Sequence, residues 1–154
     1  MGKVNYAAID IGSNAVRLLI KSIDREAVQE KKIKKVMMLR VPLRLGFDVF
    51  SIGELSEKKA DKLRRLMKAF RQLMKIYDVD DYRACATSAM RDARNGRTII
   101  KKIEKDTGIR IEIIDGQEEA RMIYNNHIEC MEDRLGNYCL LYTSPSPRDR
   151  TRSR

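Results

Sequence analysis

Alternating apolar and polar positions mark three β-strand-like stretches near the start of the chain. They are Tyr6–Ile11, Ala15–Lys21 and Val28–Leu43, with Pro42 near the end of the third. The polar turn Gly12-Ser13-Asn14 separates the first two, and apolar runs around a tight turn are typical of a hairpin. We therefore expect a meander of three antiparallel strands.

A helical pattern follows a loop that contains Gly46 and Gly53. Ser56 is a favourable N-cap, and apolar residues recur after it at steps of three and four. These positions are Ala60, Leu63, Leu66, Met67, Phe70, Leu73, Met74 and Tyr77. Since the other face is charged, the pattern predicts an amphipathic helix whose apolar side belongs to the core.

Strands and helices alternate through the rest of the chain. The expected elements are a strand at Tyr82–Ala86, a short helix through Arg91 to Arg94, a helix at Thr98–Lys105 closed by Gly108, a strand at Ile109–Ile114, a helix over residues 117–131 and a strand at Tyr138–Tyr142. This order predicts an α/β fold: a mixed sheet with three leading antiparallel strands and helical crossovers. It is the order of a ribonuclease-H-like, or actin-like ATPase, lobe.

Length and charge narrow the class of protein. The 154 residues suffice for one domain with its own core. There is no run of about 18 apolar residues that could span a bilayer, so we expect a soluble, cytoplasmic protein without a membrane partner. A formal net charge of +10 indicates an anionic partner. The spacing of the cysteines and of the single histidine does not favour a zinc site.

The composition changes abruptly at residue 143. Residues 143–154 read TSPSPRDRTRSR, which predicts disorder because nothing but the prolines could enter a core. One interpretation is a basic Ser-Arg tail that binds nucleic acid. We favour foreign sequence, because the segment interrupts a strand and resembles translated adapter read-through. The expected organisation is therefore a lobe over residues 1–142 followed by a disordered tail over 143–154.

Candidate chemistry lies where strands end, since ligands of such sheets bind beyond the carboxyl ends of the strands. In the first such segment, Asp10 precedes the turn formed by Gly12, Ser13 and Asn14. Gly12 lets the backbone approach an anion, and the turn's polar groups could hold phosphate oxygens. Asp10 could face a divalent metal or an attacking water. The alternative is an ordinary hairpin turn.

Two further segments have the same character. Thr87 and Ser88 offer hydroxyls at a helix start, and Arg91 lies one turn on, where it could reach the same phosphate. Glu118 and Glu119 open a later helix, where a carboxylate could act as general base on water. Capping of a helix by Thr87 or Ser88, and simple complementation of a helix dipole by the glutamates, are the alternatives.

Taken together, these segments resemble the exopolyphosphatase / guanosine pentaphosphate phosphohydrolase family. The matching segments are AAIDIGSNAVRLLI at Ala7–Ile20, Arg44-Leu45-Gly46, Leu55-Ser56, ATSAMRDARN at Ala86–Asn95 and GQEEARMIY at Gly116–Tyr124. They occur in the family's order and at family-like spacing, and the resemblance covers nearly all of residues 4–141.

The resemblance implies hydrolysis of terminal phosphoanhydride bonds in polyphosphate or guanosine pentaphosphate, commonly with Mg²⁺. Asp10 and the Gly12-Ser13-Asn14 turn would form the first phosphate loop. Arg91 would bind a substrate phosphate, and Glu119 would activate water, with Glu118 as the fallback. The family continues into a second D-x-G-G-G-S loop and a second lobe where this sequence has the 143–154 tail. We therefore expect an N-terminal lobe that is weakly active or inactive.

Other readings stay open. An actin-like sugar or acetate kinase would share the opening loop, although the Ala86–Asn95 and Gly116–Tyr124 segments speak against it. A non-enzymatic module that binds polyanions would use the basic charge, but the sequence does not favour nucleic acid as the partner. Polyphosphate and a phosphorylated guanosine nucleotide are not distinguished, and a homodimer remains an alternative to a monomer.

Overall fold

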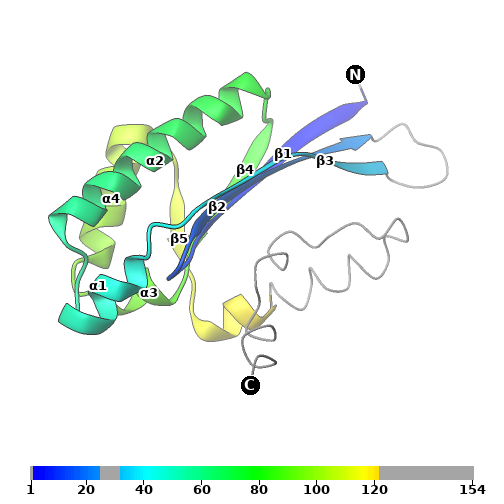
Figure 1. The fold of residues 1–154 in the computed structure, drawn as a ribbon. Helices are drawn as coiled ribbons and strands as arrows, with labels where there is room; N and C mark the ends of the chain where they lie inside the picture. The colour runs from blue at the N-terminus through cyan, green and yellow to red at the C-terminus, as the bar shows by residue number, and fades with distance from the viewer. Residues whose placement is uncertain (1, 25–31, 122–154) are drawn as a thin grey trace. The chain divides into compact units, whose positions relative to one another are not determined.

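The structure is a computed structural model, and it describes residues 2–24 and 32–121. These residues form a five-stranded sheet with the order β3-β2-β1-β4-β5 (Figure 1). The strands are β1 (Lys3–Ile11), β2 (Val16–Asp24), β3 (Lys32–Val41), β4 (Asp81–Ala86) and β5 (Ile111–Ile113). The helices are α1 (Leu45–Ile52), α2 (Glu57–Ile76), α3 (Ser88–Asp92) and α4 (Gly96–Thr107).

The sheet is mixed, as the sequence predicts. Strand β2 pairs antiparallel with both β1 and β3, while β4 pairs parallel with both β1 and β5. Parallel neighbours need a crossover connection. Helices α1 and α2 lie between β3 and β4 in the chain, and α3 and α4 lie between β4 and β5. The expected meander and the helical crossovers are both confirmed.

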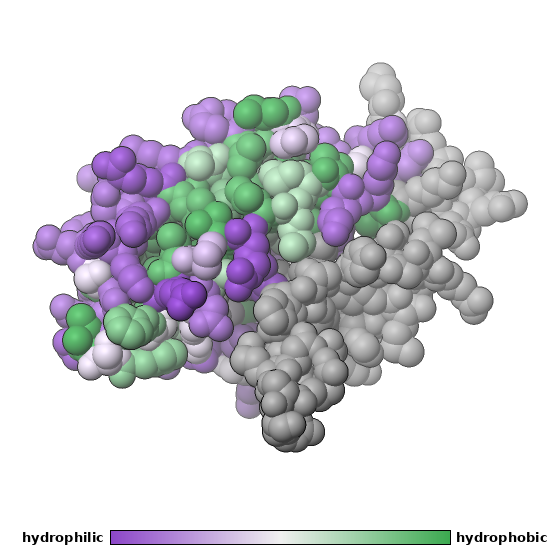
Figure 2. All heavy atoms as spheres, in the orientation of Figure 1, coloured by the Kyte–Doolittle hydropathy of each residue, from purple (hydrophilic) through white to green (hydrophobic). Residues whose placement is uncertain are grey.

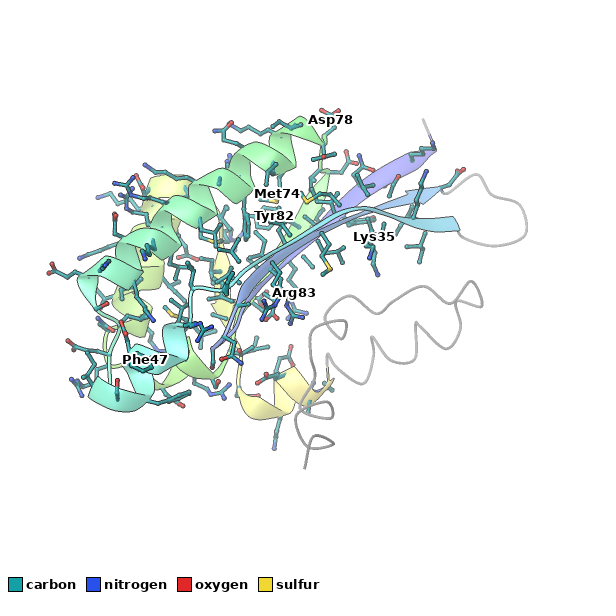
Figure 3. The ribbon with its side chains drawn as sticks, in the orientation of Figure 1. Lys35, Phe47, Met74, Asp78, Tyr82 and Arg83 are labelled. Atoms are coloured by element: carbon teal, nitrogen blue, oxygen red, sulfur yellow. The ribbon has the colours of Figure 1, made fainter. Side chains whose placement is uncertain are left out.

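The core lies between the sheet and its helices. Because side chains alternate along a strand, Ala7, Ile9 and Ile11 of β1 all point into the core. Figure 3 shows the same alternation in β4 (Asp81–Ala86), where Tyr82 lies on the side of the sheet that α2 covers and Arg83 on the other side. The second face is therefore where residues between the core positions, such as Asp10, present their side chains.

Helix α2 follows its sequence pattern closely. Leu63, Met67, Phe70 and Met74 are buried, and Ser56 is the N-cap, with its hydroxyl accepting from the Lys59 N–H at 3.3 Å. The other expected stripe positions, Ala60, Leu66, Leu73 and Tyr77, pack against the core from its edge. The apolar stripe predicts which side of α2 is buried, because burial of apolar surface is the dominant favourable contribution to folding.

One element corrects the sequence prediction. The segment with Gly46 and Gly53, expected to be a loop, contains helix α1. Leu45 and Val49 are buried one turn apart, and Gly53 ends the helix with a left-handed φ of 81°. The helix escaped the periodicity analysis because Phe47 and Phe50, its largest apolar side chains, point away from the core.

Other boundaries shift by a few residues. Helix α3 ends at Asp92 and α4 already begins at Gly96, while β5 is shorter than the Ile109–Ile114 stretch. Gly108 ends α4 with a φ of 78°, as expected. None of the helices in the described part of the chain is long and apolar enough to cross a membrane.

Contacts divide the chain into two compact units, Met1–Ile114 and Asp115–Arg154. The second unit is described only through Arg121, and residues 116–121 are helical, in agreement with the predicted helix. The remainder of that helix, the strand at Tyr138–Tyr142 and the 143–154 tail lie outside the described residues. The boundary after residue 142 therefore stays a prediction.

Candidate functional site

The parallel pairing of β1 and β4 brings two of the predicted segments to one edge of the sheet. Ile11, the last residue of β1, pairs with Ala86, the last residue of β4. The Thr87 N–H continues this pairing by donating to the Ile11 carbonyl at 3.1 Å. The turn after β1 and the turn after β4 therefore leave the sheet side by side.

The two turns touch through their serines. The hydroxyl oxygens of Ser13 and Ser88 lie 2.8 Å apart, although the residues are 75 positions apart in sequence. In such a pair one hydroxyl donates to the other, and the accepting hydroxyl keeps its own proton for a further acceptor. This confirms that the first two segments converge. It also leaves one hydroxyl proton at this point for a further acceptor.

Thr87 does not cap helix α3 through its side chain. It is the residue before the helix, yet its side chain makes no capping hydrogen bond. Its buried hydroxyl lies 3.5 Å from the Ile11 carbonyl oxygen. The structure therefore does not support the alternative that the Thr87 side chain simply caps the helix. Helix α3 has only five residues, so its dipole contributes little to anion binding.

The Arg44-Leu45-Gly46 segment holds the first turn in place. The Arg44 N–H donates to the Asn14 carbonyl at 2.9 Å, and the Gly46 N–H donates to the Ser13 carbonyl at 2.8 Å. A Cβ on Gly46 would lie only 2.9 Å from the Ser13 Cβ, so this approach needs a glycine. The sequence showed this segment only as a family match, whereas the structure shows a backbone clamp on the candidate phosphate loop.

Gly12 stabilises the same turn through a hydrogen bond inside it. Its N–H donates to the Ala15 carbonyl at 3.0 Å, and a Cβ there would meet that carbonyl oxygen at 3.1 Å. The turn is therefore tight, and it closes the β1–β2 hairpin directly after Ile11.

Asp10 forms an ion pair with Arg17, a residue that the sequence analysis did not single out. The two residues are directly opposite each other in the β1–β2 hairpin, and their side chains are 15% and 13% exposed. Among the described residues the Arg17 Nη1 is buried without a hydrogen-bond partner. A cross-strand pair of opposite charges next to the turn of the hairpin was the available signal.

The metal expected at Asp10 does not find a prepared site in the described residues. The Asp10 carboxylate is already engaged by Arg17. Within residues 2–24 and 32–121, no group of three or more His, Cys, Asp or Glu side chains lies together. A guanidinium and a divalent cation compete for the same oxygens, so the donor set in view does not fit a resident ion.

Arg91 is anchored at the same edge. It lies on α3, and its Nη1 donates to the Ile114 carbonyl oxygen at 2.7 Å. Since Ile113 pairs with Ala86, β5 also ends at this edge of the sheet. Arg91 thus connects the turn after β4 to the end of β5, and its role toward a substrate phosphate stays a prediction.

The third predicted segment is ordered around Asp115. The Glu118 N–H donates to the Asp115 Oδ1 at 2.7 Å, and the Glu119 N–H donates to the Asp115 carbonyl at 2.9 Å. Asp115 therefore caps the helical turn that carries both glutamates. This segment belongs to the second compact unit, so the convergence of Glu118 and Glu119 with the other two segments stays a prediction.

A buried carboxylate stabilises helix α1, which follows the Arg44 segment directly in the chain. Asp48 of α1 accepts from the Ser56 N–H at 3.0 Å and from the Ser56 hydroxyl at 2.6 Å, and it pairs with Lys59 at 3.6 Å. The hydrogen bonds from Ser56 and the charge of Lys59 outweigh burial and hold the pKa of Asp48 below its ordinary value. Asp48 thus ties α1 to the start of α2.

Asp48→Ala should lower the free energy of unfolding by about 2 kcal/mol at neutral pH, because it leaves the Ser56 donors without their acceptor. The lowered pKa means that this stabilisation is complete above the ordinary aspartate pKa of about 4 and is lost as the pH falls through the lower folded value. Urea unfolding of both proteins at pH 7 and pH 3.5 measures this difference. The exposed Asp92→Ala is the control, and a difference that does not shrink at low pH would contradict the assignment.

The comparisons with known proteins identify the family. The model of the Ppx/GppA phosphatase family matches residues 22–139. The chain belongs to the Ppx/GppA phosphatase family. The matched range includes the Arg44 clamp, the Thr87-Ser88 turn and the Glu118-Glu119 segment, whereas the turn at Gly12-Ser13-Asn14 lies just before it.

Individual relatives of this family match a similar span. Exopolyphosphatase 1 of Mycobacterium tuberculosis is 28% identical over 121 residues, which are 79% of this chain and 34% of that protein. The bifunctional 3-dehydroquinate synthase/phosphatase of Fusobacterium nucleatum is 30% identical over 138 residues, 88% of this chain and 21% of that protein.

Solved structures of the family share the fold. The crystal structure of the Aquifex aeolicus Ppx/GppA family member has a TM-score of 0.72 at 28% identity, covering 79% of this chain and 38% of that one. An exopolyphosphatase from Cytophaga hutchinsonii has a TM-score of 0.68 at 28% identity, covering 77% and 36%. The predicted actin-like lobe is confirmed. The chain spans about a third of the length of the first relatives it matches.

Proposed function

We propose that this chain contributes the phosphate-holding part of a hydrolase that cleaves terminal phosphoanhydride bonds, in polyphosphate or in guanosine pentaphosphate. The observation that carries the proposal is the 2.8 Å contact between the hydroxyls of Ser13 and Ser88. Two segments far apart in the sequence thereby meet through their hydroxyls and leave one hydroxyl proton for a phosphate oxygen. Membership of a phosphatase family and the names of the exopolyphosphatase relatives support the reaction class.

In this proposal each residue has a separate task. The serine hydroxyl that accepts in the Ser13–Ser88 hydrogen bond donates its own proton to an oxygen of the terminal phosphate, and the Asn14 amide donates to another. Arg91 binds a neighbouring phosphate charge, for which a guanidinium is suited because it remains charged and donates in pairs. Glu119, or Glu118 as the fallback, accepts a proton from the water that attacks the phosphorus.

Mg²⁺ enters the proposal with the substrate. Protein-bound Mg²⁺ is commonly held by one or two carboxylates together with substrate phosphates, which lets it neutralise phosphate charge. Asp10 is the candidate protein ligand, but its carboxylate faces Arg17. In this proposal Asp10 and Arg17 together hold the first turn.

The proposal is tested by binding of inorganic tripolyphosphate, measured by isothermal titration calorimetry. Ser13→Ala and Ser88→Ala should each weaken binding by about tenfold, the size expected for a hydrogen bond to a charged group. The double variant should lose less than the product of the two single losses, because the hydroxyls act as one unit.

The matched control is Ser22→Ala, which removes a hydroxyl from the far end of β2, opposite Asn5. Its affinity for tripolyphosphate should equal that of the unaltered chain. If the serine variants bind as tightly as the control and affinity depends on salt alone, the chain is a non-specific polyanion binder. That result would contradict the proposed phosphate site.

A further inference from the structure

Helices α1 and α3 both begin at the candidate phosphate site. The Gly46 N–H at the start of α1 donates to the Ser13 carbonyl at 2.8 Å, and Ser88, the first residue of α3, contacts the Ser13 hydroxyl. The two helices pack against each other and lie next to each other in Figure 1. The relative position of α1 and α3 therefore sets the distance between the two serine hydroxyls.

Helix α1 also forms a wall of an open pocket beside the first turn. Ser13, Asn14, Phe47 and Phe50 belong to the lining of this pocket. In Figure 2 hydrophobic surface gathers over α1, at the lower left, and Figure 3 shows Phe47 there on the outside of the helix. A shift of α1 would thus change the surroundings of Ser13 as well as its distance to the turn after β4.

At their other ends the two helices are tied together by hydrogen bonds. The Asn95 side chain reaches Leu55, 40 positions earlier: its Nδ2 donates to the Leu55 carbonyl at 2.9 Å, and its Oδ1 accepts from the Leu55 N–H at 3.0 Å. Next to this link, the Arg94 N–H donates to the Gly53 carbonyl at 2.9 Å. Since Gly53 ends α1 and Ala93 ends α3, these bonds fix the ends of the helices that lie away from the serines.

Asn95 does not cap the helix that it precedes. It is the residue before α4, where an asparagine side chain ordinarily accepts from a backbone N–H of the first turn. Its side chain makes no capping bond, and both of its polar atoms are engaged by Leu55 instead. The side chain therefore serves a long-range link at the expense of the local helix.

The segment between Asn95 and Ser88 is rigid enough to transmit this link. Ala89 and Met90 of α3 are buried in the core, and a Cβ on Gly96 would lie 2.1 Å from the Met90 carbonyl oxygen. The start of α4 thus packs directly against the backbone of α3. Protein interiors are close-packed, so a displacement at the link moves the helix as a unit.

We propose that Asn95 is a positioning residue of the phosphate site, which keeps Ser88 at hydrogen-bond distance from Ser13 by tying α3 to α1. This inference rests on the proposed function and adds a residue to it. Asn95 acts through the two helices and has no part in contacting the phosphate. Arg91 has its own anchor at the Ile114 carbonyl, at 2.7 Å, so loss of the link should act mainly on the serines.

The test is Asn95→Asp, which keeps the size of the side chain but removes the donor to the Leu55 carbonyl. Aspartate and asparagine are equally good N-caps, so the new side chain can cap α4 and the melting temperature should stay close to that of the unaltered chain. The affinity for inorganic tripolyphosphate at neutral pH, measured by isothermal titration calorimetry on the full chain, should fall by about fivefold to tenfold. The upper limit is the loss expected for Ser88→Ala, because the link can cost no more than the contact that it holds.

A double-mutant cycle with Ser88→Ala separates positioning from general destabilisation. If Asn95 acts by placing Ser88, Asn95→Asp in the Ser88→Ala background should change the affinity by less than about twofold. Losses that multiply fully would overturn the proposal and leave Asn95 a structural role only.

A second readout needs no ligand. Asn95→Asp should shift the backbone amide signals of Ser13 and Ser88 in a proton–nitrogen correlation spectrum, because the two turns move relative to each other. Unchanged signals at both residues would overturn the positioning role.

The matched control is Asn5→Asp, since Asn5 makes the same kind of link elsewhere. Its Nδ2 donates to the Tyr77 carbonyl at 2.9 Å, 72 positions away, and it lies near the start of β1, whereas the candidate site follows the end of that strand. The control should change neither the affinity for tripolyphosphate nor the amide signals of Ser13 and Ser88.

The outcomes distinguish the two proposals. If Asn95→Asp binds tripolyphosphate as tightly as the unaltered chain, the positioning role is wrong while the phosphate site stands. If the unaltered chain does not bind tripolyphosphate, the proposed function and the role of Asn95 fail together, whatever the spectra show.

Discussion

Glu119→Gln should slow phosphate release from polyphosphate and from guanosine pentaphosphate by about 100-fold or more, the usual contribution of a general base. A glutamine has nearly the same shape but cannot take the proton of the attacking water. The backbone N–H of residue 119 keeps its bond to the Asp115 carbonyl, which is 2.9 Å long in the structure, so the local helical turn is preserved. The loss therefore reports on chemistry and not on folding.

The measurement is single-turnover phosphate release in a buffer that contains Mg²⁺, with the protein in excess so that slow hydrolysis is still detected. Glu118→Gln decides between the two neighbours, since only the residue that acts as base should show the full loss. Glu57→Gln is the matched control, because Glu57 is an exposed glutamate in the first turn of α2. If both Glu118→Gln and Glu119→Gln release phosphate at the rate of this control, neither glutamate is the base.

Gly96→Ala should lower the free energy of unfolding by about 3 kcal/mol, at the upper end of the range for overpacking. A Cβ at this position would lie 2.1 Å from the Met90 carbonyl oxygen and 3.1 Å from its carbon. The contact is with backbone, and Met90 is 1% exposed in the core, so no flexible side chain can move aside. Either α3 or the start of α4 must shift.

Urea unfolding measures this loss, and tripolyphosphate binding adds a second readout because α3 carries Ser88 and Arg91. The matched control is Gly116→Ala, since no atom lies within 4 Å of a Cβ placed there. It should leave stability unchanged or raise it slightly, because alanine favours helix more than glycine does. A Gly96→Ala protein as stable as this control would contradict the packing described here.

Much of the fold followed from local patterns. The stripe from Ala60 to Tyr77 predicted α2 and its buried side, because a helix of this length repeats its pattern over several turns. The β1–β2 hairpin and the strand at β4 were also expected from short apolar runs around polar turns. These elements bury one face each, so their periodicity is visible without any partner.

Helix α1 could not be found in this way. Its buried apolar side chains, Leu45 and Val49, are few, while its largest apolar side chains, Phe47 and Phe50, are exposed. The same property that hid the helix from the hydrophobic pattern leaves both rings in the lining of the open pocket beside Ser13 and Asn14. Asn95 shows a similar limit: the family match includes it, but its two bonds to Leu55, at 3.0 Å and 2.9 Å, depend on a contact 40 residues away in the chain.

For the candidate site, the sequence by itself determined which residue types stand at the ends of β1 and β4 and hence the family and the kind of chemistry. Only the tertiary structure decided that Ser13 meets Ser88, that Arg17 holds Asp10, and that the Arg44 segment clamps the first turn. Such contacts depend on strand order and on the close approach of backbones at Gly46. Local sequence encodes which groups a turn carries. Which groups meet is set by the pairing of β1 with β4, two strands separated by residues 12–80 of the chain.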